Sequence, residues 1–464
     1  METAEGAAPA LDSSVARWTL IASILGSSMA FIDGSVVNVA LPSIQADLGG
    51  GLATQQWVVD AYLLTLGSLI LVGGSLGDIF GESRVFAIGV ASFAGVSVLC
   101  AVAPDAPSLI VFRGLQGAAG ALLTPASLAM ITATFTGTAR GNAIGQWTSW
   151  SGITFILGPT LGGWLVDVST WRLIFLINLP IAAATLLILM RLGGLHQARR
   201  EDLRVDVPGA ILCTAGLGLL VAGFIEQPQL GWGDPFIIGA FIAGVSLLGA
   251  FVAYELRTPM PMLPLRLFRL RNFSVANIET LSVYGGLSAL TTFLTLYLIE
   301  FAGFSALRAG ISLVPLSIVM FFLSPRMGRL SMQYGPRLFM GLGPIIAGVG
   351  VLAYTRLPQH VNYWVDIFPA LLVFSFGLSL IVAPLTTTVL ADARAGDAGV
   401  ASGVNNAVAR IAGLLAIAIL GILAAGGGDH LTVHGFHATM GAVAGLLVCG
   451  GLIGAIGIRN PGRA

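Results

Sequence analysis

This chain of 464 residues contains no lysine, few charged residues and only three cysteines. Charged residues make up 9% of it, whereas a soluble domain carries about a quarter, so a soluble globular fold is excluded. Without lysine there is no phosphate-binding loop of the kind that needs one. Cys100, Cys213 and Cys449 lie far apart in apolar segments, which is typical of small apolar filler and excludes a metal-binding cysteine motif. A net charge of zero argues against a nucleic-acid partner.

Long apolar runs fill the sequence instead. Hydrophobic residues account for 56% of the chain, and a run of about 20 apolar residues is enough to cross a bilayer as a helix. Fourteen such runs can be placed, which predicts an all-α polytopic membrane protein. They are residues 18–40, 56–77, 86–103, 108–132, 142–166, 173–192, 208–226, 236–255, 273–299, 309–327, 338–355, 366–390, 400–424 and 437–458.

The arginines give an independent test of this map. If both termini are cytoplasmic, 17 of the 22 arginines fall on the inner side and three, Arg172, Arg308 and Arg356, on the outer side. Arg113 and Arg410 lie inside spans. This bias follows the positive-inside rule and predicts a multi-pass plasma membrane protein with both ends inside. The tail 1–16 has no positive region before a short apolar run, so we expect the first span to be retained.

Two arginine-rich inner connections, 193–207 and 256–272, bracket the spans 208–226 and 236–255. This pattern predicts two six-helix halves, 17–192 and 273–458, joined by a linker, 193–272, that adds two helices. Cytoplasmic tails complete the chain at 1–16 and 459–464. The halves also repeat a pattern, because 74–84 and 328–337 both show Gly, Leu two residues later, Gly seven later and an Arg near the end. Transporters often contain such repeats, with the substrate site between them.

Asp33 lies inside the first span. A carboxylate in hydrocarbon costs roughly 2.5–3.5 kcal/mol on insertion scales, so it persists only where it faces protein or a wet cavity. Arg113, with Gln116 and Gly120 on the same helical face, falls at a similar depth in the outer half of the membrane. We therefore predict that Asp33 and Arg113 share a polar cavity and interact directly or through water. The alternative is a fixed salt bridge that only holds two helices together.

Three further ionisable residues fall in or near spans. Glu279, which shares a face with Ser282 and Gly286, is a second candidate for a proton or cation site. Its alternative is a carboxyl held by nearby hydroxyls and backbone, or one that reaches the inner interface. Asp60 lies near an outer helix end, where we expect it to reach water and line an outer vestibule. Arg410 is interpreted as structural, bonded to carbonyls across a helix interface.

Aromatic and hydroxyl residues in the core spans fit either packing or contact with a flat lipophilic substrate. They are Trp147, Trp150, Phe155, Tyr284, Thr291, Thr292 and Tyr297. A membrane enzyme or receptor would need a polar cluster or a sizeable soluble domain. His430, His434 and His437 have a spacing that could bind a metal on a helix, but they fall in a glycine-rich outer loop, where incidental placement is favoured.

Five motifs occur in order along the chain. The first span contains Asp33 and Asn38 before Pro42, the second begins with Trp57 and continues to Asp60 and Tyr62, and the fourth carries Arg113, Gln116, Gly117 and Gly120. The loop 74–84 contains Gly74, Asp78, Gly81 and Arg84, and the fifth span contains Gly158, Pro159, Gly162 and Gly163. On these motifs the chain resembles the major facilitator superfamily and, within it, the fourteen-span drug:proton antiporters of the EmrB/QacA type.

The resemblance implies the major facilitator fold and no enzymatic activity. It implies proton-coupled efflux of small lipophilic, often cationic, compounds by alternating access, with Asp33, Arg113, Glu279, Asp60, Gln116 and Asn38 in the coupling and substrate region. It assigns conformational roles to the 74–84 and 158–163 motifs, although Ile79 and Glu82 stand where basic residues are usual. No cofactor is expected besides the proton gradient, and the partners are substrate, protons and lipid around a monomer. A dedicated exporter of one antibiotic, lipid or siderophore carries the same motifs and stays an alternative.

Overall fold

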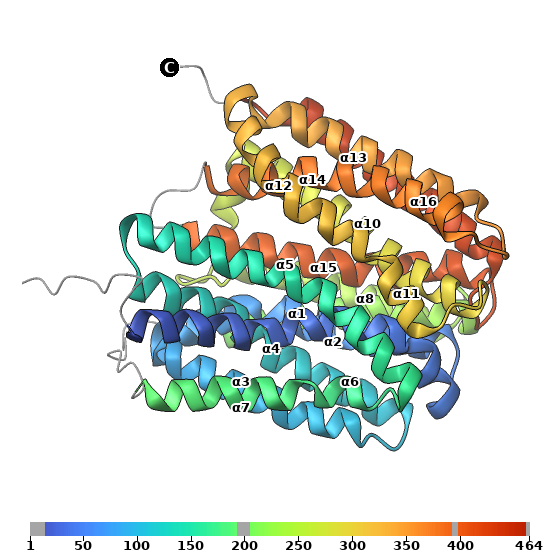
Figure 1. Cartoon of the computed structure of the whole chain (residues 1–464), viewed down its shortest axis with the longest axis horizontal. Helices are drawn as coiled ribbons and strands as arrows, with labels where there is room; N and C mark the ends of the chain where they lie inside the picture. Colours follow the sequence, from blue (N-terminus) through green and yellow to red (C-terminus); the bar gives the residue numbers. More distant parts are fainter. Residues whose placement is uncertain (1–13, 193–204, 392–397, 461–464) are drawn as a thin grey trace, which may run out of the picture.

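The computed structural model describes residues 14–192, 205–391 and 398–460, and its regular elements in these ranges are all helical. The long helices run side by side along one axis (Figure 1). A helix satisfies its own backbone hydrogen bonds, which is the condition for crossing hydrocarbon. The first seven helices are α1 (Ser14–Leu48), α2 (Leu52–Phe80), α3 (Glu82–Ala101), α4 (Ala106–Thr134), α5 (Gly137–Val168), the short α6 (Leu173–Leu176) and α7 (Asn178–Arg191).

The rest of the chain continues in the same manner. A helical pair, α8 (Val207–Leu230) and α9 (Pro235–Glu255), is followed by a second long group. This group consists of η1 (Leu265–Arg269), α10 (Arg271–Glu300), α11 (Ala306–Ser312), α12 (Val314–Tyr334), α13 (Pro336–Leu352), η2 (Ala353–Arg356), η3 (Tyr363–Ile367), α14 (Phe368–Ala391), α15 (Ala398–Ala425) and α16 (Val433–Gly457).

Within the described ranges, thirteen helical segments are long and apolar enough to cross a membrane. The all-α polytopic membrane fold predicted from the sequence is therefore confirmed. Helix α5, which contains the predicted span 142–166, is not among the thirteen. Its 32 residues exceed the length needed, but its first half is rich in glycine, threonine, serine and other polar residues. It nevertheless lies alongside the other long helices in Figure 1.

Two spans predicted as continuous are interrupted. The segment 173–192 is divided at Ile177 between α6 and α7, and 309–327 is divided at Leu313 between α11 and α12. Pro180 and Pro315 follow these breaks, and a proline has no N–H to donate to the preceding turn. Other helices extend past the predicted ends, as α1 does, because hydropathy marks only the part in hydrocarbon whereas helical hydrogen bonding continues beyond it.

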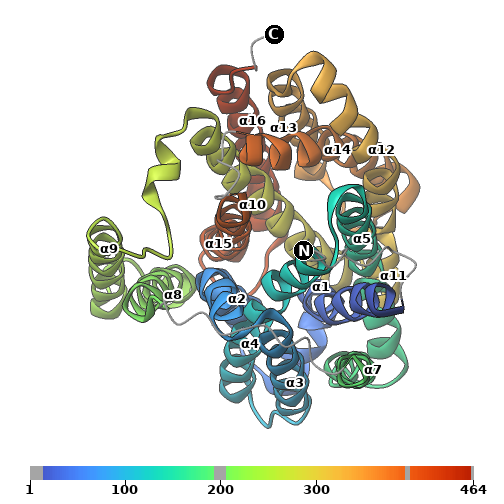
Figure 2. The same ribbon diagram turned by 90° about the vertical axis from the view of Figure 1, so that its left-hand side faces the viewer.

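The helices form two packed groups. In the first, α1 packs along α5 and α2 along α4; in the second, α13 packs between α14 and α16, and α10 along α15 and α16. The groups meet where α2 contacts α15, where α5 contacts α11, and where α1 contacts α10. Viewed along the helices, the two groups lie on opposite sides of these contacts (Figure 2).

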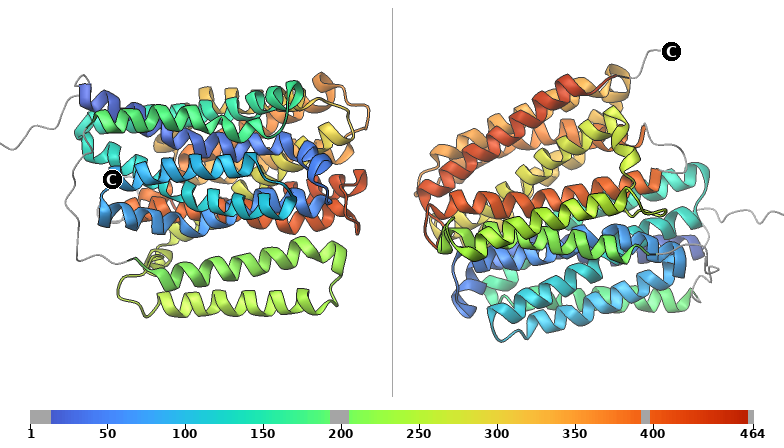
Figure 3. Two further views of the ribbon diagram at one scale, coloured as in Figure 1. Left: turned by 90° about the horizontal axis from the view of Figure 1, so that it is seen from below. Right: turned by 180° about the vertical axis from the view of Figure 1, so that it is seen from behind.

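The pair α8 and α9 lies on one flank of the molecule (Figure 3). The two helices approach closely because Gly216 faces Leu248 and Gly244 faces Leu220, as small residues allow between membrane helices. Helix α8 contacts both α2 and α15 and so covers the line where the groups meet, with α9 outermost. Several residues used in the predicted orientation lie outside the described ranges: Arg199, Arg200, Arg204, Arg394 and Arg463.

The repeated loop pattern is also visible in the backbone. Gly81 and Gly335 each end one helix and begin the next, with φ of 93° and 87°. This left-handed conformation is readily available only to glycine. The same sharp turn therefore joins α2 to α3 and α12 to α13, which supports the internal repeat inferred from the sequence.

Candidate functional site

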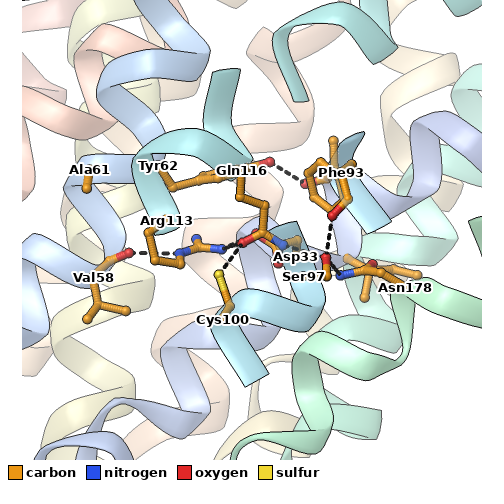
Figure 4. A network of polar contacts seen from close by, with 12 residues as sticks. Asp33, Val58, Ala61, Tyr62, Phe93, Ser97, Cys100, Arg113, Gln116 and Asn178 are labelled. Atoms are coloured by element: carbon orange, nitrogen blue, oxygen red, sulfur yellow. Dashed lines mark hydrogen bonds and ion pairs between the residues drawn. The ribbon is translucent and has the colours of Figure 1, made fainter. Parts of the chain in front are cut away.

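Asp33 of α1 and Arg113 of α4 form an ion pair in the interior of the first helical group (Figure 4). Nη1 of Arg113 lies 2.5 Å from Oδ2 of Asp33, and the two side chains are 1% and 0% exposed. The attraction between buried charges offsets their desolvation only when the remaining polar atoms are also bonded. The predicted direct interaction between these residues is present.

Gln116 completes this bonding. Its Nε2 donates to Oδ1 of Asp33 at 3.0 Å and lies 2.9 Å from the Ser97 hydroxyl of α3, while its Oε1 accepts from Arg113 at 2.6 Å. Asn178 of α7 donates to the same Ser97 hydroxyl at 3.2 Å. Four helices, α1, α3, α4 and α7, therefore supply one connected network (Figure 4). The sequence pattern placed Gln116 beside Arg113 but gave no sign of Ser97 or Asn178.

Helix α2 covers the other side of the arginine. Nε of Arg113 donates to the carbonyl of Val58 at 3.0 Å, and the guanidinium carbon lies 4.4 Å from the ring centre of Tyr62. A Cβ added at Gly117 would collide with the carbonyl oxygen of Tyr62. The glycine therefore permits the close α2–α4 approach that positions the cation against the ring.

The prediction that Asp33 and Arg113 share a polar cavity is wrong, because the structure encloses the pair. Asp33, Arg113 and Gln116 have essentially no exposed surface. All the partners in the network come from the first group of helices. The charges are enclosed because Tyr62, Phe93 and Phe175 pack around a network that satisfies its own hydrogen bonds.

Asp60 also differs from the prediction. Instead of reaching water, its side chain is fully buried, and neither carboxyl oxygen has a hydrogen-bond partner. It lies on the face of α2 that carries Gln56 and Gly67, and both of these contact α15. Asn38 of α1 likewise has a buried carbonyl oxygen without a partner. Packing against the second helical group removes the water that a position near a helix end would otherwise have.

Glu279 of α10 is 0% exposed, and both of its carboxyl oxygens lack hydrogen bonds. It faces Gly454 of α16, where the carbonyl oxygen of Met340 from α13 also lies. Ser282 and Gly286 face α16 as well, so the predicted common face is confirmed. The alternative in which nearby hydroxyls hold the carboxyl, or in which it reaches the interface, is wrong. A carboxyl in this position is strongly disfavoured in its charged form.

The interpretation of Arg410 on α15 as a structural residue that donates hydrogen bonds to carbonyls is wrong. It is only partly buried and, within the described residues, has no hydrogen bond and no ion pair. Its guanidinium carbon lies 5.9 Å from the ring centre of Phe31 on α1. The side chain therefore reaches from the second helical group to the first.

The 158–163 motif occupies the junction of three helices. Gly158 faces Ser35 and Gly162 faces Val36, both on α1, whereas Gly163 faces the backbone of α11 at Ala306. Across the same contact, Gly310 of α11 faces the carbonyl of Pro159. The glycines of this motif therefore form a packing face that joins the two groups of helices.

The 74–84 motif lies at the end of the bundle where α2 turns into α3. Gly74 lies beside Pro125 of α4, Gly81 makes the left-handed turn, and Asp78 and Arg84 are exposed. The structure thus places Asp78 and Arg84 on the surface, at the same end of the bundle as Ser14 and Gly457.

At the opposite end of the bundle the two groups are joined by polar contacts. The carboxylate of Asp167 on α5 accepts hydrogen bonds from the backbone N–H groups of Ala306 and Leu307, each at 3.0 Å. Gln55 donates to Glu300 at 2.9 Å, and the N–H of Leu52 donates to the carbonyl of Asp429 at 2.6 Å. These bonds close this end, because each one crosses from the first group to the second.

Polar side chains are exposed toward the end that carries the termini. Gln146 and Ser149 of α5, Thr387 of α14 and Asn406 of α15 are all exposed, and so is Trp150. Polar side chains in spanning helices usually face protein or a water-filled space. Of the other predicted aromatic residues, Tyr297 is fully buried against Phe436, and the side chain of Phe155 lies outside the described part of the chain.

No group of three metal-binding side chains exists among the described residues. Nε2 of His437 lies 2.9 Å from the carbonyl oxygen of Leu357, and His430 lies 3.4 Å from its neighbour Asp429. His196 falls outside the described ranges.

Comparison with known proteins identifies the class. The family described as the Major Facilitator Superfamily matches residues 23–206 and 207–417. This chain belongs to that superfamily, and the recognition drawn from its motifs is confirmed. Since this is a family of transporters, the expectation that the chain is not an enzyme is confirmed as well.

Several relatives are named as drug or antibiotic resistance proteins or as antibiotic transporters. A puromycin resistance protein of Streptomyces alboniger is 33% identical over 93% of this chain and 89% of its own length. A probable actinorhodin transporter of Streptomyces coelicolor is 34% identical over 88% of this chain and 72% of its own length. The multidrug resistance protein Stp of Mycobacterium tuberculosis is 34% identical over 88% of this chain and 76% of its own length.

Solved structures show the same fold. A structure from work on proton-dependent oligopeptide transporters superposes with a TM-score of 0.66 at 16% identity, covering 94% of this chain and 97% of that one. A bacterial homologue of the human lysosomal transporter Spinster gives a TM-score of 0.65 at 17% identity, with 96% and 97% covered.

Proposed function

We propose that this protein exports small lipophilic compounds from the bacterial cytoplasm in exchange for protons, by alternating access. The observation that carries the proposal is the fully buried Asp33–Arg113 pair. A packed membrane protein has little structural need for a charged pair in its interior, because apolar residues of similar volume are often as stable. The export of drugs and antibiotics is suggested by relatives that are named for drug resistance or for antibiotic export.

We propose fourteen membrane-spanning helices, with α5 as the fourteenth. The first group of helices forms one six-helix half (17–192), the second forms the other (273–458), and the α8–α9 pair with its linkers (193–272) lies between them in sequence. The observed packing supports this division, because α8 contacts both groups but α9 lies outside them. The exposed Asp78 and Arg84 lie at the end that the arginine distribution assigns to the cytoplasm, with both termini there.

The buried pair suggests how a proton could be used. Protonation of Asp33 removes the negative charge that Arg113 faces, so the cation is left with uncharged partners: Gln116, the carbonyl of Val58 and the ring of Tyr62. The contact between α1 and α4 is then weaker, and these helices can shift relative to one another. Deprotonation restores the pair, so the protonation state of Asp33 and the packing of the first half are coupled.

Glu279 and Asp60 are proposed as further proton sites. Each carboxyl is fully buried without a hydrogen bond, so in this conformation we propose that each carries a proton. Uptake and release of the proton require that the same carboxyl reach water in another conformation. Both residues lie on helices, α10 and α2, that contact the opposite half.

The structure has features of a state closed to the outside. The contacts of Asp167, Gln55 and Leu52 join the halves at the proposed outer end, while exposed polar residues of α5 and α15 lie toward the inner end. For export, the outer contacts must separate and the inner faces must meet. The 158–163 motif then acts at the contact of α5 with α11, and the 74–84 motif acts at the inner end.

The substrate is proposed to be a drug or toxic compound taken up from the cytoplasm or lipid. A dedicated exporter of one antibiotic remains a second candidate, because relatives include a tetracenomycin C resistance and export protein and a cephamycin export protein. We propose a monomer as the working unit, since one chain supplies both halves.

The test is transport in proteoliposomes with an imposed pH gradient. Efflux dyes and antibiotics would be screened with the intact protein and with Asp33→Asn. Gradient-dependent movement that Asp33→Asn abolishes supports the proposal, and activity on several unrelated compounds favours multidrug export over a dedicated substrate. Substrate movement that is indifferent to the proton gradient would refute proton coupling.

A further inference from the structure

Arg410 lies near the middle of the spanning helix α15. It is about 18 Å along α15 from Ala398, at 1.5 Å per residue, in a helix of 28 residues. Within the described chain it forms neither a hydrogen bond nor an ion pair, although its guanidinium has five N–H donors. A cation in this position is expected to be paired or to mark a substrate path.

The surrounding helices give the arginine room to extend. On α2, Gly67 lies opposite, and a Cβ added there would be 3.1 Å from the Cβ of Arg410. The side chain passes this glycine and reaches the ring of Phe31 on α1, 5.9 Å from the guanidinium carbon. A larger residue at position 67 would occupy the space at the base of this side chain.

Aromatic residues lie near the guanidinium. Phe31 makes an edge-to-face contact with Trp147 of α5 at 6.1 Å between ring centres, and Nε1 of Trp147 donates to the Ser27 hydroxyl at 2.9 Å, which fixes the indole. On α10, Tyr284 follows Thr280 by one helical turn, and Thr280 accepts a hydrogen bond from Asn405 of α15 at 2.8 Å, so Tyr284 lies at about the level of Arg410. Phe31 therefore lies beside the guanidinium, Trp147 supports Phe31, and Tyr284 lies on the neighbouring helix of the other half.

Polar side chains are exposed between this point and the proposed inner end. Asn406 precedes Arg410 by one helical turn, lies on the same face of α15 and is exposed. Gln146 and Trp150 of α5 are also exposed. Polar surface on α5 and α15 therefore lies on the inner side of the level of Arg410.

We propose that Arg410 binds the acidic group of an aromatic, lipophilic organic anion, and that Phe31, Trp147 and Tyr284 contact the ring system. The inference rests on the proposed export function and narrows its substrate class. A guanidinium binds a carboxylate, phenolate or sulfonate through charge-assisted hydrogen bonds, while a cationic compound would be repelled at this point. Under this inference the preferred substrates are acidic, whereas the family resemblance led us to expect cationic ones.

The experiment uses two probes that differ by one group. These are 8-anilinonaphthalene-1-sulfonate and the neutral N-phenyl-1-naphthylamine, which has the same rings without the sulfonate. Saturable binding to the full-length protein in lipid nanodiscs is measured by energy transfer from tryptophan, with empty nanodiscs as background. Intact protein is compared with Arg410→Gln and Arg410→Lys. The control is Arg356→Gln, which removes an exposed arginine at the proposed outer end of the bundle.

We expect Arg410→Gln to weaken sulfonate binding about tenfold to a hundredfold and to change binding of the neutral probe less than twofold. Arg410→Lys should be intermediate, because it keeps the charge but not the planar group, and Arg356→Gln should match intact protein. The assignment would be overturned if each variant bound the sulfonate and the neutral probe more weakly by the same factor. It would also be overturned if Arg410→Gln bound the sulfonate as tightly as the intact protein does. A third result against the assignment would be an intact protein whose affinity for the sulfonate is no higher than its affinity for the neutral probe.

Transport separates this inference from the function on which it rests. If Arg410→Gln still moves the neutral probe in response to a pH gradient, proton-coupled export stands whatever the binding data say about Arg410. If the intact protein moves neither probe with the gradient but binds the sulfonate through Arg410, the anion site stands and proton coupling fails.

Discussion

Replacing Asp33 with Asn tests whether the buried pair is a coupling element or only a structural salt bridge. The substitution keeps the shape of the side chain and leaves an oxygen that can accept from Arg113. It removes the charge, however, so the guanidinium remains 1% exposed with no anion beside it. Leaving one charge of a buried pair uncompensated destabilises a protein by about 3–5 kcal/mol. Because the asparagine oxygen can still accept a hydrogen bond from Arg113, we expect Asp33→Asn to lower the free energy of unfolding by about 3 kcal/mol, the lower end of this range.

The double variant Asp33→Asn with Arg113→Gln removes both charges. It loses the hydrogen bond from Arg113 to Val58, worth about 1 kcal/mol, but no longer buries an isolated cation. We therefore expect its free energy of unfolding to lie within about 1–2 kcal/mol of that of the intact protein, because neutral replacements of buried ion pairs are often well tolerated. The single Arg113→Gln variant should be as unstable as Asp33→Asn.

Unfolding of all four proteins in mixed micelles of increasing sodium dodecyl sulfate content, followed by tryptophan fluorescence, gives the double-mutant cycle. Transport in proteoliposomes with and without a pH gradient is measured on the same preparations. We expect the double variant to recover stability but not gradient-driven transport. Recovery of both would show that the pair is only a structural bridge. If the loss of stability in the double variant equals the sum of the losses in the two single variants, the claim that the two charges stabilise each other is refuted.

Two further predictions follow from the packing. Glu279→Gln should change the free energy of unfolding by less than about 1 kcal/mol, because the carboxyl has no hydrogen bond to lose. It should lower gradient-driven transport at least tenfold, and unaltered transport in proteoliposomes would exclude Glu279 as a proton site. Gly163→Ala should lower stability by about 1–3 kcal/mol, because the added Cβ would lie 2.5 Å from the carbonyl oxygen of Ala306. The matched Gly95→Ala in α3 meets nothing within 4 Å and should be neutral or stabilising, since alanine favours helix; equal thermal shifts would contradict this packing.

The sequence by itself determined the spanning helices and much about their faces. Each spanning helix satisfies its backbone within one continuous segment, so local composition is sufficient to locate it, as it did for thirteen of the predicted spans. Helical periodicity placed Arg113 beside Gln116, and Glu279 on one face with Ser282. Counting residues from the helix ends placed Asp33 and Arg113 at similar depths, which is why their contact could be predicted.

Only the tertiary structure decided what surrounds each charge. Hydropathy treats a residue near a helix end as accessible, yet Asp60 is fully buried because α15 packs over it. Ser97 and Asn178 join the Asp33 network from helices far away in sequence, and no local pattern encodes that meeting. The local sequence around Arg410 is the same whether this arginine is paired or not. That it has no hydrogen bond or ion pair within the described chain depends on which side chains of the opposite half lie near it. Long-range packing sets the solvation and pairing of every buried charge, and these properties are absent from the pattern along one helix.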